Sequence, residues 1–236
     1  MTWAKQSFKD SPLSIAQGEV NGHTVRNIFG YQTSVTTAFI PAWEFATAYT
    51  YPPSALLMDV ASGNVADNGS PVKIVGLDAN YNEIEEVVTL PQTTTQAFFR
   101  INDVIFLGTG GNAGLITVAN GGTNYAAIRI GDGRNQASIY TVPAGKCFFL
   151  YRLDAFSADS TAAKPGIFKN LSISSTGQEF NVARTTFFNN MNIQRRMPFK
   201  YDEKTDIQLQ LSAASGTHEM NVFGEGVLCD LDVLNT

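Results

Sequence analysis

The sequence predicts an all-β chain, folded as a jelly-roll-like β-sandwich with an extended N-terminal arm. Runs rich in Val, Ile, Phe and Tyr recur along the chain, and turn residues separate them roughly every 8 to 15 positions. Apolar and polar residues alternate in several runs, most clearly at Ile207, Leu209 and Leu211. No stretch of useful length has the 3.6-residue period of a helix. Sheet must therefore pack on sheet.

The expected strands follow from these runs in order along the chain. They are residues 24–36, 55–62, 72–77, 83–90, 97–107, 114–118, 125–130, 138–142, 146–156, 168–174, 180–188, 195–201, 206–215 and 219–231. Residues 41–49 are expected to form a single helical turn. In the run 146–156 both faces are largely apolar, with Phe149, Tyr151 and Leu153 alternating against Phe148 and Leu150. Such a strand is central between layers or covered by a partner.

Residues 1–24 are interpreted as an N-terminal arm, and residues 25–236 as the sandwich domain. The arm is polar, contains Pro12 and carries Trp3 and Phe8. Exposed aromatic side chains on an arm are costly unless a partner buries them. The arm is therefore expected to grip another protein, and the alternative is that it folds back on its own sandwich.

Composition restricts the classes of partner. The chain has 236 residues, 44% of them hydrophobic, only 16% charged, and a net charge of −5. The densest basic cluster is Arg195–Arg196 with Lys200 and Lys204, and acidic neighbours dilute it. Nucleic-acid binding needs a sustained basic face, so no nucleic-acid partner is expected. No stretch approaches the roughly 18 apolar residues of a membrane span, so neither a membrane nor an export signal is expected.

The two cysteines, Cys147 and Cys229, stand far apart in apolar runs that are expected to form strands. Two buried free thiols are predicted from this context. A disulfide between them remains the alternative, although two cysteines in a chain this long do not make a disulfide framework.

One stretch has the spacing of the first calcium ligands of a helix-loop-helix site, with Asp78, Asn80 and Asn82 at alternate positions. Such a loop needs Gly at its sixth position and a bidentate Glu at its twelfth. Glu83 and Thr89 occupy those positions here. The stretch is therefore predicted to be the turn of a β-hairpin, and no metal site is expected.

The candidates for nucleophilic catalysis are few. His23 and His218 each stand in a turn-like context and are predicted to be solvated loop residues. His218-Glu219 beside Ser215 comes closest to a triad, but neighbours in sequence on a loop rarely form that geometry.

Carboxylate pairs are the other catalytic candidate, because paired acids hydrolyse glycosidic bonds. Glu83, Glu85 and Glu86 have the spacing of an exposed strand face, and Asp230 and Asp232 are expected to share one face of the last strand. No convergent constellation follows from these positions. The prediction is a non-enzymatic protein with no catalytic residues.

A cofactor interpretation of "GTGGNAG", residues 108–114, is rejected because a strand rather than a helix is expected to follow it. No cofactor and no cofactor-binding residue are therefore expected.

Three stretches resemble structural proteins of tailed-bacteriophage virions, of the marine and cyanobacterial phage type. They are "VGLDANYNEIEEVVTLPQTTTQAFFRIN" (75–102), "SIYTVPAGKCFFLYRL" (138–153), and "MPFKYDEKTDIQLQL" (197–211) with "VFGEGVLCD" (222–230). The resemblance implies a particle component and assigns no catalytic residue.

The resemblance does not distinguish the head of the particle from the tail. Within this class, the leading hypothesis is a capsid decoration protein on the outer surface of the head, which would be assembled in the host cytoplasm. Its partners would be the major capsid protein or tail proteins of the same particle, and further copies of itself, with a trimer favoured. The alternative is a tail or baseplate module that attaches to host surface glycan. A third hypothesis is a glycan-cleaving enzyme that depends on Glu83 or Asp230.

Overall fold

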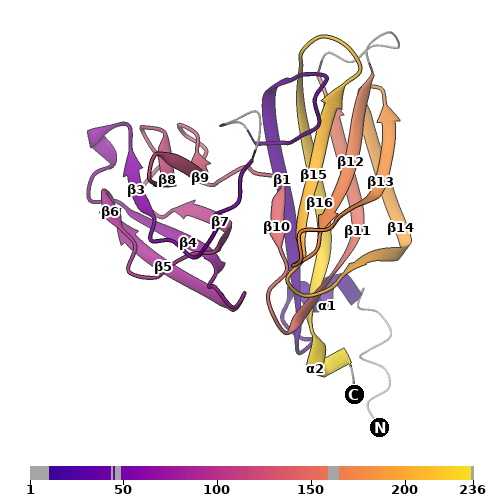
Figure 1. The fold of residues 1–236 in the computed structure, drawn as a ribbon, viewed down its shortest axis with the longest axis horizontal. Coiled ribbons are helices and arrows are strands. Elements are labelled where there is room, and N and C mark those ends of the chain that lie inside the picture. The colour runs from indigo at the N-terminus through magenta and orange to yellow at the C-terminus, as the bar shows by residue number, and fades with distance from the viewer. Residues whose placement is uncertain (1–10, 44, 46–48, 159–164, 235–236) are drawn as a thin grey trace.

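The computed structural model describes residues 11–43, 45, 49–158 and 165–234. Apart from two short helices and one 3₁₀ helix, the regular elements of these residues are all strands, which confirms the predicted all-β sandwich class. The chain builds two lobes (Figure 1). A large sandwich is made by segments on either side of residues 52–135, and those residues form a smaller lobe inserted between β2 and β10.

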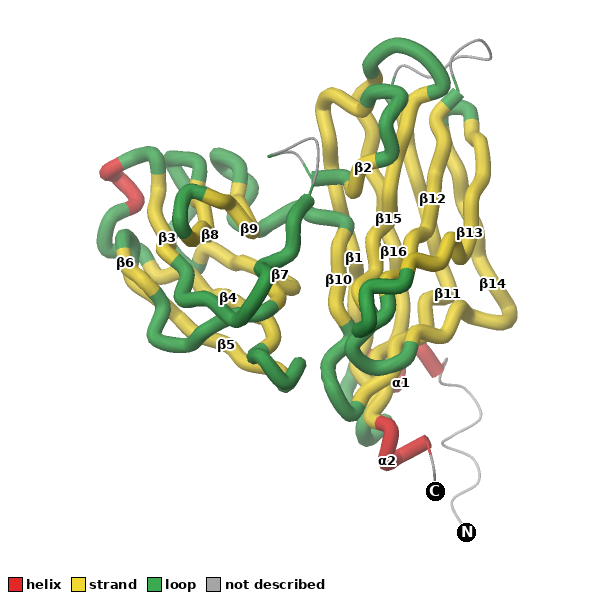
Figure 2. The backbone as a smooth tube through the Cα atoms, in the orientation of Figure 1, coloured by secondary structure: helices red, strands yellow, loops and turns green. Residues whose placement is uncertain are grey.

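The large sandwich consists of two antiparallel sheets (Figure 2). The first has the order β1-β16-β11-β14, formed by β1 (His23–Val35), β16 (His218–Asp230), β11 (Lys146–Ser157) and β14 (Asn190–Tyr201). The second has the order β10-β15-β12-β13, formed by β10 (Ile139–Thr141), β15 (Asp206–Ala213), β12 (Gly166–Ile173) and β13 (Glu179–Phe187), while β2 (Ile40–Pro41) also pairs with β15.

Strand β15 is buried along its whole length. Ile207, Leu209 and Leu211 enter the core between the two sheets, as their alternation predicted. Gln208 and Gln210, on the opposite face, are buried as well. Tyr51, just before the insertion, lies against this polar face, and the Gln208 amide donates to its hydroxyl at 3.4 Å.

A β-bulge changes the expected two-faced pattern of β11. The register of β11 against both of its neighbours shifts between Leu150 and Arg152. One extra residue moves the following side chains to the other face. Leu153 therefore enters the same core as Phe148 and Leu150, so its predicted grouping with Phe149 and Tyr151 was wrong.

The insertion lobe has its own two small sheets and its own core. Its elements are β3 (Asp59–Ser62), the 3₁₀ helix η1 (Val65–Asp67), β4 (Pro71–Leu77), β5 (Glu83–Thr89), β6 (Gln92–Thr93), β7 (Arg100–Phe106), β8 (Ile116–Asn120) and β9 (Thr123–Ile128). The sheet orders are β6-β3-β8-β9 and β5-β4-β7. All core residues of this lobe come from residues 56–128. The sequence interpretation, one sandwich over 25–236, did not include this division, because strand periodicity does not reveal which core a strand joins.

The described part of the predicted arm contains a short helix, α1 (Ser11–Ala16), which lies beside β1. Trp3 and Phe8 lie outside the described residues. The chain ends in a second short helix, α2 (Leu231–Leu234). Of the helical turn expected over 41–49, residues 44 and 46–48 lie outside the described residues, and Trp43 forms an isolated antiparallel bridge with Ala137. None of the described helices is long and apolar enough to cross a membrane.

Candidate functional site

A buried ion pair joins the two lobes. The Arg100 guanidinium on β7 donates to Asp206 at the start of β15, from Nε to Oδ1 at 2.9 Å and from Nη2 to Oδ2 at 3.0 Å. Arg100 is 8% exposed and Asp206 is 5% exposed. Burial disfavours the Arg100 cation, but the hydrogen bond and charge of Asp206 outweigh it and hold the pKa of the guanidinium above its ordinary value. Aromatic rings of Phe99 and Tyr51 flank the cation at 4.0 and 4.5 Å.

Further hydrogen bonds fix the lobes beside this pair. Asn102 and Thr141 exchange two bonds of 2.9 Å, from the Asn102 amide to the Thr141 carbonyl and from the Thr141 N–H to the Asn102 side-chain oxygen. The Ala144 N–H donates to the Tyr81 carbonyl at 2.8 Å. These groups satisfy one another, so the junction has a structural role.

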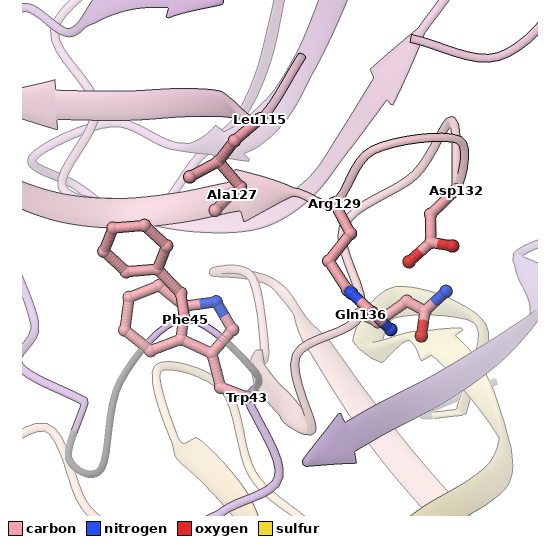
Figure 3. A pocket seen from close by; sticks show the side chains of 7 residues that line it. All are labelled: Trp43, Phe45, Leu115, Ala127, Arg129, Asp132 and Gln136. Carbon is pink, nitrogen blue, oxygen red and sulfur yellow. The ribbon is translucent and has the colours of Figure 1, made fainter. Parts of the chain in front are cut away.

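A pocket of about 210 Å³ lies next to the junction, where the connection after β2 meets β9 and the loop that follows it. Its walls are shown in Figure 3: Trp43, Phe45, Leu115 and Ala127 are apolar, and Arg129, Asp132 and Gln136 are polar. Trp43 is 3% exposed, and its indole Nε1 has no hydrogen-bond partner among the described residues. The aromatic and polar groups lie on opposite sides of the hollow (Figure 3).

The side of the sandwich away from the insertion lobe is formed by β13 and β14 (Figures 1 and 2). These strands are the edges of the two sheets, and most of their residues are exposed or half-buried. Phe180, Phe188 and Met197 are large apolar side chains that are 48%, 53% and 77% exposed. We call residues 179–201 the apolar edge.

Within the apolar edge, residues 195–198 leave the ladder. Strand β14 pairs with β11 at Gln194 and again at Phe199, but the four residues between have no partner there. All four are exposed, with Met197 at their centre. The Arg195 guanidinium turns back over the Phe199 ring at 4.0 Å. The edge therefore presents a projecting apolar residue beside basic ones.

The structure confirms the predicted hairpin between β4 and β5. The Asp78 carboxylate accepts hydrogen bonds from the N–H groups of Asn80 and Asn82 at 2.8 and 2.9 Å, and from the Asn82 amide at 3.0 Å. Burial works against ionisation of Asp78, but these bonds outweigh it and lower the pKa of the carboxyl. Asp78 thus holds the turn together.

The two histidines differ from each other. His23 Nδ1 donates to the Asn21 carbonyl at 2.8 Å on a half-buried strand end. The prediction for His218 was wrong: it is buried at the start of β16, where a bulge in β1 pairs it with Val35. Its Nε2 donates to the backbone carbonyl of Ser215 at 2.9 Å, so the Ser215 hydroxyl is not the partner and no triad forms there.

The acidic candidates accept ion pairs or hydrogen bonds from other residues, and Glu83 and Asp230 are brought together by one shared partner. Lys146 lies between Glu83 at 2.8 Å and Asp230 at 3.2 Å. Glu85 pairs with Lys73, and Glu86 accepts hydrogen bonds from the N–H groups of the 95–96 loop. Asp232 lies in α2, so the expected shared strand face with Asp230 was wrong.

Cys147 and Cys229 face each other across neighbouring strands, because β11 and β16 place them directly opposite. Both are buried free thiols, as predicted. Burial raises the pKa of both, that of Cys229 to about 11. Thiols that remain protonated are poor nucleophiles.

The glycine-rich stretch 108–114 leads into strand β8, as the sequence predicted, so its glycines serve a loop between strands. The residues that line the pocket, such as Trp43, Asp132 and Gln136, were not singled out from the sequence. Trp43 stood in the segment interpreted as a helical turn, and its partners lie about 90 positions further along the chain.

No protein-family model matches the sequence, and no curated protein matches it. Solved structures with some similarity include the crystal structure of the infectious bursal disease virus VP2 subviral particle, with 11% identity and a TM-score of 0.26 over 90% of this chain and 73% of that chain. The structure of the infectious bursal disease virus Gt strain gives 11% identity and a TM-score of 0.23 over 92% and 77%. Scores this low carry no argument about function, which rests on the residues of the chain itself.

Proposed function

We propose that this protein is a non-enzymatic structural component of a virion, and specifically a decoration protein on the outer surface of the head. The observation that carries the proposal is the apolar edge, residues 179–201. Large exposed apolar side chains on the edge strands of a sheet are typical of a surface that another protein covers. Met197 is the most exposed of its large apolar side chains, at 77%, and would be its central contact.

The resemblance of residues 75–102, 138–153 and 197–211 to virion proteins of tailed phages supports the same class. The low charge of the chain suits contacts with large neutral surfaces. Each contact would gain on the order of 25 cal/mol per Å² of apolar area removed from water, repeated over many copies. The partners would be the major capsid protein and further copies of this chain arranged about a symmetry axis, with a trimer favoured.

Immunogold labelling of purified particles, with antibody against this chain, tests the proposed location. Gold spread over the head supports decoration. Gold confined to the tail replaces decoration with the alternative, a module that attaches to host surface glycan. Absence of gold from every particle contradicts a virion role altogether.

The N-terminal arm is proposed to add a second grip on the shell. Deleting residues 1–10, which include Trp3 and Phe8, should lower the number of copies bound per particle. The thermal midpoint of the free protein should not change, because both described cores lie outside that segment. Full occupancy after the deletion would refute the role of the arm.

A further inference from the structure

We propose that the pocket beside Trp43 binds one pyranose ring of a glycan, with the side chains of Asp132 and Gln136 as its polar contacts. This inference does not rest on the decoration role, because the pocket and the apolar edge share no residues. It would apply equally to a protein located on the head or on the tail.

The apolar wall of the pocket suits the face of a sugar ring. The half-buried Phe45 ring packs against the buried Trp43 ring, with centroids 5.5 Å apart and the planes 35° from parallel, and it lines the hollow. Leu115 and Ala127 extend this apolar wall. The axial C–H groups of a pyranose carry partial positive charge, and the face of an aromatic ring is negative. An aromatic wall therefore attracts the face of a sugar ring, and the ligand need not carry a charge.

The polar groups of the pocket are of the kinds that hydroxyls satisfy. The Trp43 nitrogen is buried from solvent, so it is not counted among these groups. The Asp132 carboxylate accepts, and the Gln136 amide both donates and accepts. A hydroxyl, which donates and accepts at once, matches both.

The size and charge of the pocket further restrict the range of ligands that it could bind. A volume of about 210 Å³ is below the roughly 300 Å³ at which pockets for drug-sized ligands begin, so it admits a single ring. Arg129 and Asp132 bring opposite charges to the same rim. A phosphate or other strong anion would be attracted by one and repelled by the other. A neutral sugar at the end of a chain fits this rim best.

Tryptophan fluorescence provides a direct test, because the chain has two tryptophans. In a Trp3→Phe background, Trp43 is the sole tryptophan and lies in the pocket wall. Titration with glucose, galactose, rhamnose and N-acetylglucosamine should give a saturable change in emission with at least one of them. Glycerol, which has hydroxyls but no ring, should give none. If no sugar in this panel changes the emission, the inference is overturned.

Two variants establish whether binding uses the named groups. Asp132→Asn and Gln136→Leu should each weaken binding of the responding sugar by about tenfold, the loss typical of one hydrogen bond to a polar or charged group. Glu219→Gln changes an exposed carboxylate on β16, outside both the pocket and the apolar edge, and should leave the affinity unchanged. Undiminished binding in both pocket variants would place the sugar elsewhere and overturn the assignment. Failure of this test would leave the immunogold result for the decoration role unaffected.

Discussion

Arg100 and Asp206 are 106 positions apart in the sequence, and folding brings them together between the lobes. Attraction between buried charges must offset the loss of water from both. The bidentate geometry and the Thr141 hydroxyl, which also donates to Asp206, provide that compensation. The pair therefore fixes how the two lobes meet. Removing one partner should destabilise the protein mainly because the other charge is left buried without a partner.

Arg100→Leu should destabilise the protein by about 3–5 kcal/mol, because it leaves the buried Asp206 carboxylate without its cation. Replacing both residues by leucine should cost much less than the single change. Urea denaturation of the two variants measures the difference. Arg134→Leu is the control, since its partner Asp103 meets a mostly exposed guanidinium, and that loss should stay below about 1 kcal/mol. Equal costs for the single and the double variant would contradict the argument.

Asp67 gives the insertion lobe a dependence on pH. Burial works against its ionisation, but hydrogen bonds from the Ser62 hydroxyl and the N–H groups of Ala113 and Gly114 outweigh it and hold its pKa below the ordinary value of 3.8. A carboxyl with a lowered pKa in the folded state stabilises fully above its unfolded value. That stability is lost as the pH falls below about 3.8 toward the folded value.

The thermal midpoint should therefore fall as the pH is lowered through and below that range. Asp67→Asn should be less stable near neutral pH and should show a shallower decline in acid, because the residue no longer titrates. Calorimetry of both proteins across the range measures the two slopes. Asp78 and Glu86 also have lowered pKa values in this lobe, so some decline should remain in the variant. Identical slopes would exclude Asp67 as a contributor.

Among the strands, β14 contains both regularly paired residues and an unpaired stretch, and the unpaired stretch belongs to the proposed contact surface. It is paired with β11 at both of its ends, yet residues 195–198 stand away from the ladder. Pro198 lacks the N–H that a ladder needs, which favours such a departure at an edge strand. Because the two paired ends anchor the projection, it can present Met197 in a fixed position.

Met197→Glu should weaken binding to particles by about tenfold or more, because burying a methionine side chain is worth roughly 1.5–3 kcal/mol. The stability of the free chain should change by less than about 0.5 kcal/mol, since the residue is exposed. Co-sedimentation of the chain with particles measures the first effect and urea denaturation the second. Val65→Glu, at an 82% exposed position in the insertion lobe, is the matched control and should bind normally. Normal binding by Met197→Glu would remove the apolar edge from the proposed contact.

The sequence predicted the individual strands and turns better than it predicted which strands and side chains lie against one another. The hairpin at Asp78 depends on neighbouring residues, and its turn chemistry was readable directly. The bulge at Tyr151 and the burial of His218 depend on the register with distant strands, which local periodicity does not contain. The pocket was missed for the same reason, because Trp43 lines the same hollow as Asp132 and Gln136 only in the folded chain.

At the scale of the whole molecule, the insertion lobe interrupts the large sandwich along the sequence. Trp43 and Ala137, on either side of the insertion, are bridge partners in an antiparallel arrangement. The chain therefore leaves the large sandwich and returns to it at one place, and the sandwich can close its sheets around that point. Such a connection leaves the inserted lobe free to form its core from its own residues.

The insertion lobe should accordingly fold when residues 52–135 are produced alone. Its core draws only on residues 56–128, and a fragment of about 80 residues is long enough to bury one. Arg100 would then lie at the surface, where water solvates its charge. The fragment should show dispersed amide signals by NMR and one cooperative urea transition, and Ile74→Asp in that core should abolish both. A fragment that is unfolded without this substitution would mean that contacts with the large sandwich, the Arg100–Asp206 pair foremost, are needed to fold the lobe as well as to orient it.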